Sequence, residues 1–325
     1  MKTKAIRFDK TGGPEVLHFE EIDVGEPSAG EARVRHTAIG VNFIDNYHRT
    51  GLYPVPLPSG IGLEAAGVVD AVGPGVTQVQ VGQRVAYCSG PIGAYSERQN
   101  VPAERLVPLP SGISDEQGAA MMLKGMTAEY LLRRTHRVTP GETILFHAAA
   151  GGVGLIACQW AKHLGAVVIG TAGSDDKAAL ARAHGCDHVI VYSREDVAAR
   201  VREITGGRGV PVVYDAVGQA TFDASIDSLS PRGLFVSFGN ASGPVKPFPL
   251  TLLSLKGSLY LTRPTLTTYT ATRDDLLASA RALFDVVASG AVKVEVRQRF
   301  PLAEAAAAQR ALESRQTVGS IVLVP

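Results

Sequence analysis

Three closely spaced glycines could bring backbone N–H groups into contact with a phosphate. Gly151, Gly152 and Gly154 form a motif close to G-x-G-x-x-G, with Ala149 in place of its first glycine. Because glycine has no Cβ, a diphosphate can approach the N–H groups that open the following helix. The motif therefore predicts dinucleotide binding. The alternative is a tight turn that only packs a helix against a strand.

The segments on either side of the glycines have the patterns needed to position them. Residues 142–146 form a short apolar run typical of a strand. After the turn, apolar residues recur at intervals of three and four, which predicts a helix with one apolar face made by Val153, Ile156, Ala157, Trp160, Ala161 and Leu164. Gly165 is placed to end this helix. Strand, glycine turn and helix, in that order, are the context in which such a motif binds a dinucleotide.

The end of the next predicted strand indicates which dinucleotide binds. NAD sites carry Asp or Glu there, because a carboxylate binds the ribose hydroxyls. This strand, residues 166–171, ends in Ala172-Gly173-Ser174 without an acid. Ser174 and Lys177 suit the 2′-phosphate of NADPH, which carries close to two negative charges, so we predict NADPH. The alternative is an ordinary helix start with Ser174 as N-cap and Lys177 in solvent.

Composition limits the possible classes of function. The chain has 325 residues, a net charge of +1, 45% hydrophobic residues and 19% charged residues, as in a globular protein of about two domains. It has no long basic run, which argues against nucleic-acid binding as the main role. Residues 1–10 lack a signal-peptide core, and no stretch is typical of a membrane span. Cys88, Cys158 and Cys186 match neither a disulfide framework nor a zinc spacing, so we expect a cytoplasmic protein.

Secondary-structure patterns predict two domains. Short strands punctuated by Gly and Pro are predicted at 4–8, 31–38, 65–72 and 83–87, followed by a helix at 116–132. From residue 141 the pattern predicts a doubly wound parallel sheet, with strands at 143–147, 166–171, 188–192, 210–215, 233–238 and 258–262 and helices between the first five. The remainder, with helices at 274–289 and 302–314 and strands at 292–299 and 320–324, is too small to fold alone. We therefore predict that residues 125–263 form a nucleotide-binding domain inserted into a first domain made of 1–124 and 264–325.

Several motifs resemble those of one family. They are Gly40-Val41-Asn42-Phe43-Ile44-Asp45, Gly51-Leu52-Tyr53-Pro54, Gly62-Leu63-Glu64-Ala65-Ala66-Gly67, Leu123-Lys124-Gly125, residues 147–154, Val236-Ser237-Phe238-Gly239-Asn240 and Thr262-Arg263-Pro264. Through them the chain resembles, over essentially its whole length, the bacterial NADPH-dependent quinone oxidoreductases of the zeta-crystallin type, in the medium-chain dehydrogenase/reductase superfamily. The resemblance implies a GroES-like domain with a partly open β-barrel, an inserted Rossmann domain, a cleft between the two and a homodimer.

The resemblance also implies a set of cofactor contacts. They are Asn42, Phe43, Ile44, Asp45, Asn46, Tyr130, Gly151, Gly152, Val153, Gly154, Gly173, Ser174, Lys177, Tyr192, Phe238, Gly239, Asn240, Ala241 and Arg315. Tyr192, at the end of a predicted strand, could stack beside the adenine, or it could be a strand-end tyrosine half in solvent. Ala216 stands where a close relative has Ser, so that contact is not carried over.

The zinc ligands of related enzymes are missing from the sequence. Zinc-dependent relatives place Cys after the Gly-Val turn and His before the Glu of a Gly-His-Glu motif, where this chain has Asn42 and Leu63. Leu cannot bind a metal, and Asn is a poor zinc ligand. We therefore expect no metal, and without zinc the oxidation of a simple alcohol is difficult.

Quinones suit a site without a metal, because they are strongly electrophilic and the protein mainly has to align cofactor and substrate. The candidates for the cleft wall are Asn42, Asp45, Tyr47, Tyr53 and Arg263. Asn42 could hydrogen-bond a carbonyl or ribose, the tyrosines could stack on a flat ring or donate a proton, and Arg263 could meet negative charge on a quinone oxygen. Alternatively, Asn42 and Asp45 organise a turn, Arg263 pairs with Asp45, and the tyrosines only pack.

These observations predict an NADPH:quinone oxidoreductase. Two alternatives stay open: reduction of an activated double bond in an enone or alkenal, and a non-enzymatic role as an NADPH-binding structural or RNA-binding protein of the zeta-crystallin type. Balanced charge and an aromatic content of 6% argue against an RNA-binding surface. The residues do not distinguish hydride transfer from one-electron steps.

Overall fold

The computed structural model describes residues 1–314 and 317–325 and forms two compact units. Unit 1 comprises Met1–Met126, Thr270–Ala288 and Val294–Pro325, and unit 2 comprises Thr127–Tyr269 and Ser289–Lys293. The predicted domain boundaries fall after residues 124 and 263, and the short segment Ser289–Lys293 of unit 2 lies within the predicted first domain. Arg315, a predicted cofactor contact, lies outside the described residues.

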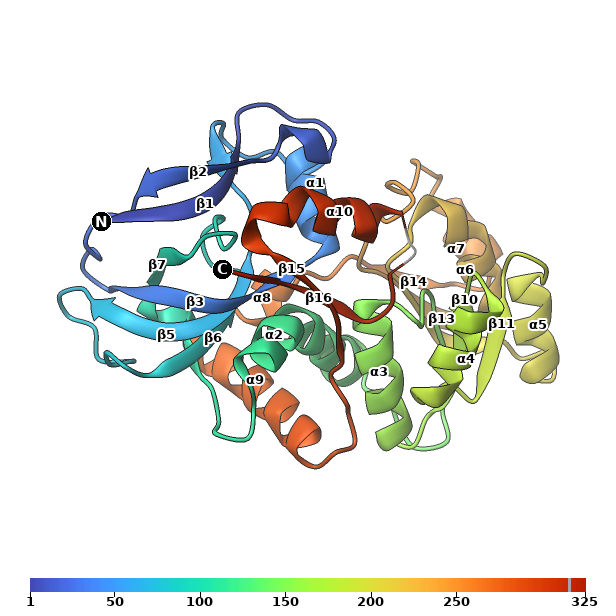
Figure 1. Cartoon of the computed structure of the whole chain (residues 1–325). Helices are drawn as coiled ribbons and strands as arrows, with labels where there is room; N and C mark the ends of the chain where they lie inside the picture. Colours follow the sequence, from blue (N-terminus) through green and yellow to red (C-terminus); the bar gives the residue numbers. More distant parts are fainter. Residues whose placement is uncertain (315–316) are drawn as a thin grey trace. The chain divides into compact units, whose positions relative to one another are not determined.

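Unit 1 is built on two β-sheets (Figure 1). A three-stranded sheet has the order β2-β1-β4, with β1 at Lys2–Phe8, β2 at His18–Asp23 and β4 at Ser59–Gly60. The second sheet has the order β15-β16-β3-β5-β6-β8, and β7 also pairs with β3. Its strands are β3 (Glu31–Val41), β5 (Glu64–Val72), β6 (Arg84–Cys88), β7 (Arg98–Pro102), β8 (Val107–Pro108), β15 (Val296–Pro301) and β16 (Ser320–Val324). The predicted GroES-like domain is confirmed.

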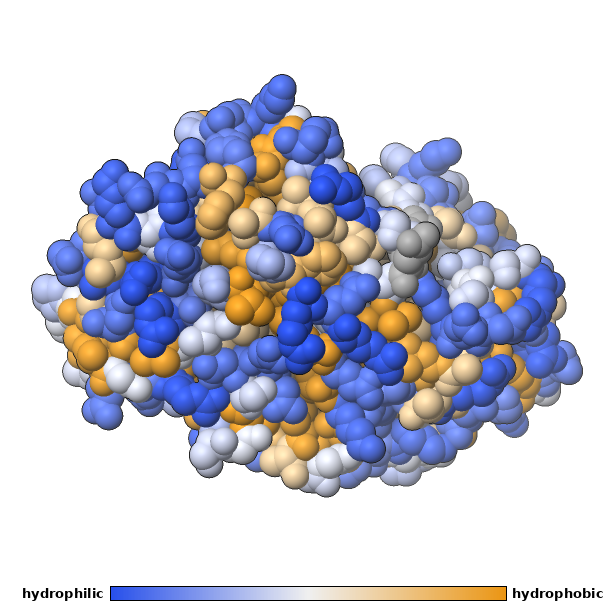
Figure 2. Space-filling model, in the orientation of Figure 1, coloured by the Kyte–Doolittle hydropathy of each residue, from blue (hydrophilic) through white to orange (hydrophobic). Residues whose placement is uncertain are grey.

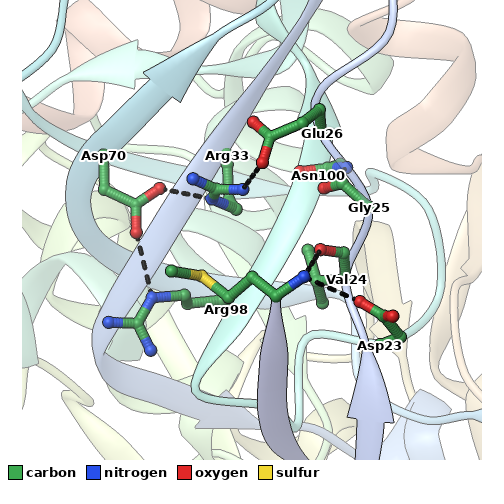
Figure 3. Close-up of polar contacts among 9 residues, drawn as sticks. Asp23, Val24, Gly25, Glu26, Arg33, Asp70, Arg98 and Asn100 are labelled. Carbon is green, nitrogen blue, oxygen red and sulfur yellow. Dashed lines mark hydrogen bonds and ion pairs between the residues drawn. The ribbon is translucent and has the colours of Figure 1, made fainter.

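Helices and ion pairs complete unit 1. Its helices are α1 (Phe43–Thr50), α9 (Arg273–Ala288), α10 (Ala305–Glu313) and the first part of α2 (Asp115–Tyr130), which continues into unit 2. Figure 3 shows one carboxylate joining three strands: Asp70 on β5 accepts from Arg33 Nε on β3 at 2.7 Å and from Arg98 Nε on β7 at 3.0 Å. The amino group of Met1 donates to Asp23 Oδ1 at 2.8 Å and so ties down the start of β1.

Unit 2 contains a six-stranded sheet in which every pairing is parallel. The order is β11-β10-β9-β12-β13-β14, with β9 at Thr143–Phe146, β10 at Val167–Ala172, β11 at His188–Val191, β12 at Val210–Asp215, β13 at Leu229–Ser237 and β14 at Tyr260–Thr262. Helices α3 (Gly152–His163), α4 (Asp175–Ala183), α5 (Val197–Ile204) and α6 (Phe222–Ser228) connect the strands, followed by the short α7 (Thr251–Leu255) and α8 (Leu266–Tyr269). The predicted doubly wound sheet is confirmed.

Some element boundaries differ from the predictions. The strand predicted at 292–299 begins only at Val296, because the backbone of Lys293 is bonded to a side chain: its N–H donates to Gln159 Oε1 at 3.0 Å and its C=O accepts from Gln159 Nε2 at 3.1 Å. The strand predicted from 258 begins at Tyr260, since Ser258 has φ +57°. Helix α1 is not among the predicted elements, because it is short and mostly polar.

One face of the molecule is mostly polar. Figure 2 shows hydrophilic side chains over much of one face, with hydrophobic side chains in separate patches. Among the residues that the structure describes, no helix combines the length and apolar character needed to cross a membrane.

Candidate functional site

The predicted cofactor segments of unit 2 follow successive strands of its parallel sheet. The glycine turn follows β9, residues 173–177 follow β10, Tyr192 follows β11, residues 238–241 follow β13 and Arg263 follows β14. Because all pairings are parallel, the carboxyl ends of these strands lie along one edge of the sheet. The order reverses at β9, which has β10 on one side and β12 on the other, and ligands of open α/β sheets bind at such a point.

The glycine turn serves both packing and access. Helix α3 begins at Gly152, with Gly151 as an extended N-cap at φ −79° and ψ 172°. A Cβ at Gly154 would lie 2.4 Å from Ala148 O, so this glycine is required for close packing of helix against turn. A Cβ at Gly151 would meet only Ala148 O, at 3.1 Å. The open side of Gly151 adjoins the first N–H groups of α3, which have no acceptor within the helix, and this arrangement fits a diphosphate.

A buried hydrogen-bond network holds the turn in place. His147 has no exposed surface; its Nδ1 lies 3.1 Å from Thr171 Oγ1 and its Nε2 lies 3.0 Å from Ser225 Oγ. Ser225 in turn donates to Asp215 Oδ2 at 2.9 Å. Burial lowers the pKa of His147, which keeps the ring neutral. The network supports the backbone at Ala148, whose φ of +52° is unusual for a residue other than glycine.

The end of β10 shows the helix start predicted by the alternative interpretation of Ser174. Ser174 is the N-cap of α4, and its Oγ accepts from Lys177 N at 3.4 Å. Arg194 forms a bidentate pair with Asp175 in the first turn of the same helix, at 2.6 and 2.8 Å. Sequence reasoning missed Arg194 as a cation near this position, because the two residues of the pair belong to different connections of the sheet.

Tyr192 lies against Gly173, the glycine that follows β10. A Cβ at Gly173 would lie 2.6 Å from Tyr192 Oη, so the ring occupies the space that a larger residue would need. The side chain is 51% exposed. An exposed aromatic ring beside the end of β10 is suited to stacking on a flat base, and the predicted alternative, a tyrosine half in solvent, describes the same geometry.

Residues 238–241 are fixed on the end of β12. Phe238 N donates to Asp215 O at 2.8 Å, and Ala241 N donates to Ala216 O at 3.2 Å. A Cβ at Gly239 would lie 2.4 Å from Ala216 O, so the two segments run in close contact. Arg263 Nη1 lies 3.4 Å from the carbonyl oxygen of Gly239, which places its guanidinium beside this segment.

Tyr130 and Tyr269 form a stacked pair elsewhere in unit 2. Their ring centroids are 4.5 Å apart and the planes differ by 9°. Burial raises the pKa of Tyr130. The ring of this predicted cofactor contact is therefore held in one orientation, with its phenol protonated.

In unit 1, the predicted residues 42–46 form the start of α1. Asn42 is the N-cap, and its N–H donates to Asp45 Oδ2 at 2.8 Å; the same oxygen accepts from Tyr95 Oη at 2.8 Å. Asp45 has no exposed surface, and burial raises its pKa to about 7. These contacts support the alternative in which Asp45 organises the turn.

Several buried polar atoms in α1 have no hydrogen-bond partner among the described residues. They include Asp45 Oδ1, His48 Nδ1 and both amide atoms of Asn46. A buried polar group without a partner is costly, and most such groups in folded proteins are paired. The amide of Asn46, with its donor and acceptor both unmatched, fits a site that a polar ligand completes.

An aromatic cluster adjoins these polar groups. The rings of Tyr47 and Tyr53 meet edge to face, with centroids 5.2 Å apart and planes at 66°. Phe43 adds a third ring, 6.1 Å from that of Tyr47, while Ile44 is partly buried beside it in the helix. The structure thus brings the two predicted tyrosines together, from α1 and from the loop that follows.

The side chains with metal-binding chemistry are scattered. Within residues 1–314 and 317–325, no group of three or more His, Cys, Asp or Glu side chains is arranged to hold a metal ion. Asn42 instead donates to the carboxylate of Glu64.

Comparisons with known proteins identify the family. The model described as "Alcohol dehydrogenase GroES-like domain" matches residues 28–111, and "Zinc-binding dehydrogenase" matches residues 152–276. A quinone oxidoreductase of Pseudomonas aeruginosa is 57% identical over 323 residues, covering 99% of both chains. A 2-haloacrylate reductase of a Burkholderia species is 50% identical, covering 99% of this chain and 98% of the relative. The crystal structure of Escherichia coli quinone oxidoreductase complexed with NADPH superposes with a TM-score of 0.98 at 52% identity, covering 99% of this chain and all of that one. The chain therefore belongs to the quinone oxidoreductase family of the medium-chain dehydrogenase/reductase superfamily.

Proposed function

We propose that this protein is an NADPH-dependent quinone oxidoreductase. The observation that carries the proposal is the edge of the parallel sheet in unit 2, where a glycine turn opens α3 and the neighbouring strand ends without an acid at Ser174. That edge suits the diphosphate and the 2′-phosphate of NADPH. Membership of the quinone oxidoreductase family supports the quinone as acceptor.

The residues that would hold NADPH belong to both units. In unit 2, the N–H groups of Gly152, Val153 and Gly154 would bind the diphosphate, while Ser174, Lys177 and Arg194 would bind the 2′-phosphate. Tyr192 would stack on the adenine, and residues 238–241 together with Tyr130 would border the rest of the dinucleotide. In unit 1, Asn42 and Asn46 would contact the nicotinamide half. Arg315 remains part of the proposal on the basis of the family resemblance.

Bound NADPH supplies two electrons, and a quinone becomes a hydroquinone when it takes up two electrons and two protons. The chain has to hold a flat substrate and provide for its oxygens. We propose that Tyr47 and Tyr53 contact the ring plane and that their hydroxyls are the nearest proton donors. Arg263 would stabilise negative charge on an oxygen, and Asp45 would act indirectly by fixing the start of α1.

Steady-state kinetics test this assignment. The protein should oxidise NADPH with 1,4-benzoquinone or 9,10-phenanthrenequinone at a much higher kcat/KM than with an alkenal. The 2-haloacrylate reductase among the relatives makes double-bond reduction the second candidate, although the relative named for quinone reduction is more similar, at 57% against 50% identity. A higher kcat/KM on 2-chloroacrylate or the alkenal would reverse this order.

We further propose a homodimer that forms through the edge of the sheet in unit 2. Strand β14 is the last strand of the described sheet, and Tyr260 on it is 63% exposed. Leu250, the N-cap of α7, and Leu255, its last residue, are 78% and 83% exposed. An open strand edge beside exposed leucines suits pairing with a second copy. The double substitution Leu250→Glu/Leu255→Glu should shift the sedimentation coefficient to that of a monomer.

A reducing, cytoplasmic location is the last part of the proposal. Cys88, Cys158 and Cys186 are all unpaired and buried in the described structure, as suits a compartment that keeps thiols reduced. Fractionation of cells that express the tagged chain would test the location.

A further inference from the structure

The carboxylate of Glu64 joins two elements of unit 1 next to the proposed nicotinamide contact. Glu64 has no exposed surface. Its Oε2 accepts from Asn42 Nδ2 at 2.7 Å, and its Oε1 accepts from the backbone N–H of Leu123 on α2 at 2.7 Å. Gly40 makes this approach possible, since a Cβ there would lie 2.2 Å from Glu64 Oε2. Glu64 therefore connects the end of β3 to α2.

Lys124 is the second buried charge at this point. Its Nζ lies 3.5 Å from Glu64 Oε2 and 3.3 Å from the carbonyl oxygen of Val41, the residue before Asn42. The side chain is 8% exposed. The ammonium of Lys124 thus contacts both the carboxylate that binds Asn42 and the backbone carbonyl of the residue before Asn42. Three N–H donors converge on Glu64, and an ionised carboxylate can accept from all of them.

This geometry fixes the polarity of the Asn42 side chain. An amide has a donor end and an acceptor end of nearly the same shape, so a neutral environment could accommodate either orientation. Burial raises the pKa of Glu64, whereas the Lys124 ammonium and the N–H groups of Asn42 and Leu123 favour its ionised form. An ionised carboxylate only accepts, and it therefore selects the orientation in which Nδ2 faces Glu64. The Oδ1 of Asn42 then faces the backbone N–H of Asp45, its partner in the capping box of α1, and its second lone pair is left as an acceptor for another group. A ligand at this oxygen must bring a donor, such as a hydroxyl or an amide N–H.

We propose that Glu64 and Lys124 are positioning residues that set the orientation of the Asn42 amide. Asn42 Oδ1 then accepts a hydrogen bond from a ribose hydroxyl or the carboxamide N–H of the nicotinamide half of NADPH. The inference rests on the proposed function and adds to it two residues that touch neither cofactor nor substrate. It also specifies the chemical class of the group that Asn42 recognises, a hydrogen-bond donor.

Glu64→Gln tests the inference, because it replaces an acceptor-only group with an amide of the same shape. The new carbonyl can accept from Leu123 N–H, and the new NH2 group then faces Asn42 and reverses its amide. We expect the Kd of NADPH, measured by calorimetry, to rise roughly tenfold. The Kd of 2′,5′-ADP, which lacks the nicotinamide half, should stay unchanged.

A second substitution provides a matched rescue. Asn42→Asp in the Glu64→Gln background moves the carboxylate to position 42, where one oxygen accepts from the new amide and the other again faces the ligand. The Kd of NADPH should return to within about threefold of wild type, since the two sites are in contact and their effects are not additive. Asn42→Asp alone brings two carboxylates together and should weaken NADPH binding further than Glu64→Gln does.

The outcomes separate this inference from the proposed function. A wild-type protein that binds neither NADPH nor 2′,5′-ADP would refute the proposed function itself. If wild type binds both ligands, three results would overturn the inference. The first is an unchanged affinity of Glu64→Gln for NADPH, and the second is a parallel loss of its affinity for NADPH and for 2′,5′-ADP. The third is no recovery of NADPH affinity in the double variant. If Glu64→Gln does not fold, Asn42→Leu is tested instead. The inference then requires that Asn42→Leu bind NADPH more weakly than wild type does, while its Kd for 2′,5′-ADP stays unchanged.

Discussion

The two units arrange their candidate site residues by different means. At the sheet edge of unit 2, the main features are backbone N–H groups, glycines without a Cβ and residues that directly follow strands. At the start of α1 in unit 1, the features are buried side chains: the acid Asp45, the amide of Asn46 and the pair formed by Glu64 and Lys124. The features in unit 2 depend on the path of the backbone. Those in unit 1 depend on buried charges and hydrogen bonds, and the loss of one partner of such an interaction lowers the free energy of unfolding.

Removing one charge of the pair in unit 1 should have the largest effect. Lys124→Met leaves the carboxylate of Glu64 buried without its counter-charge, and the free energy of unfolding should fall by about 3–5 kcal/mol in urea denaturation. The double variant Glu64→Gln/Lys124→Met should recover part of the loss. Lys10→Met removes an exposed lysine of the same unit and serves as the control, with almost no expected change. An effect of Lys124→Met no larger than that of the control would show that the pair does not matter for stability.

The buried acid should make stability depend on pH. The pKa of Asp45 is raised by burial to about 7 in the folded protein from its ordinary value of 3.8, so the folded state binds more protons than the unfolded state between these values. Stability from this group is therefore present at low pH and is lost as pH rises toward about 7. Asp45→Asn should gain stability relative to wild type between pH 4 and pH 8, by up to about 4 kcal/mol.

Denaturation curves at pH 4, 6 and 8 would measure this difference. Asp70→Asn, at a carboxylate that two arginines bind, is a suitable control because it should show no such gain at high pH. A constant difference between Asp45→Asn and wild type across the three pH values would contradict the assignment.

In unit 2, steric exclusion should matter more than charge. Gly154→Ala places a Cβ 2.4 Å from a backbone oxygen that cannot move away easily, so we expect a loss of about 1–3 kcal/mol in stability and weaker NADPH binding. Gly112→Ala, with no atom within 4 Å of the new Cβ, should leave both unchanged. Equal behaviour of the two variants would remove the case for close packing at the turn.

The smallest expected effect concerns the choice of cofactor. Lys177→Ala should raise the KM for NADPH roughly tenfold, about 1.4 kcal/mol, while the KM for NADH changes little, because only NADPH carries the 2′-phosphate. If the guanidinium of Arg194 also binds the 2′-phosphate, Arg194→Ala should raise the KM for NADPH further. A Lys177→Ala variant that affects both cofactors equally would support the solvated-helix interpretation.

The contrast between the units also explains what the sequence could predict. The sheet of unit 2 was predictable because each strand contains a short apolar run and most of its candidate site residues come soon after a strand, as Ser174 does after β10. Arg194 was missed, since its place depends on a pair with Asp175 across two connections. Helix α1 was also missed, and the roles of Glu64 and Lys124 were not visible, because their contacts join segments about 60 residues apart in the sequence.

The pairing of β16 with β3 has a consequence for how the site is assembled. Ile321–Leu323 pair with Ile39–Val41, the residues that lead directly into Asn42. On a ribosome, one edge of that part of β3 would therefore stay unpaired until residues 321–323 have been made, whereas the strands of unit 2 could already pair. The strand that completes the support of Asn42 would then emerge only after every strand of the unit 2 sheet.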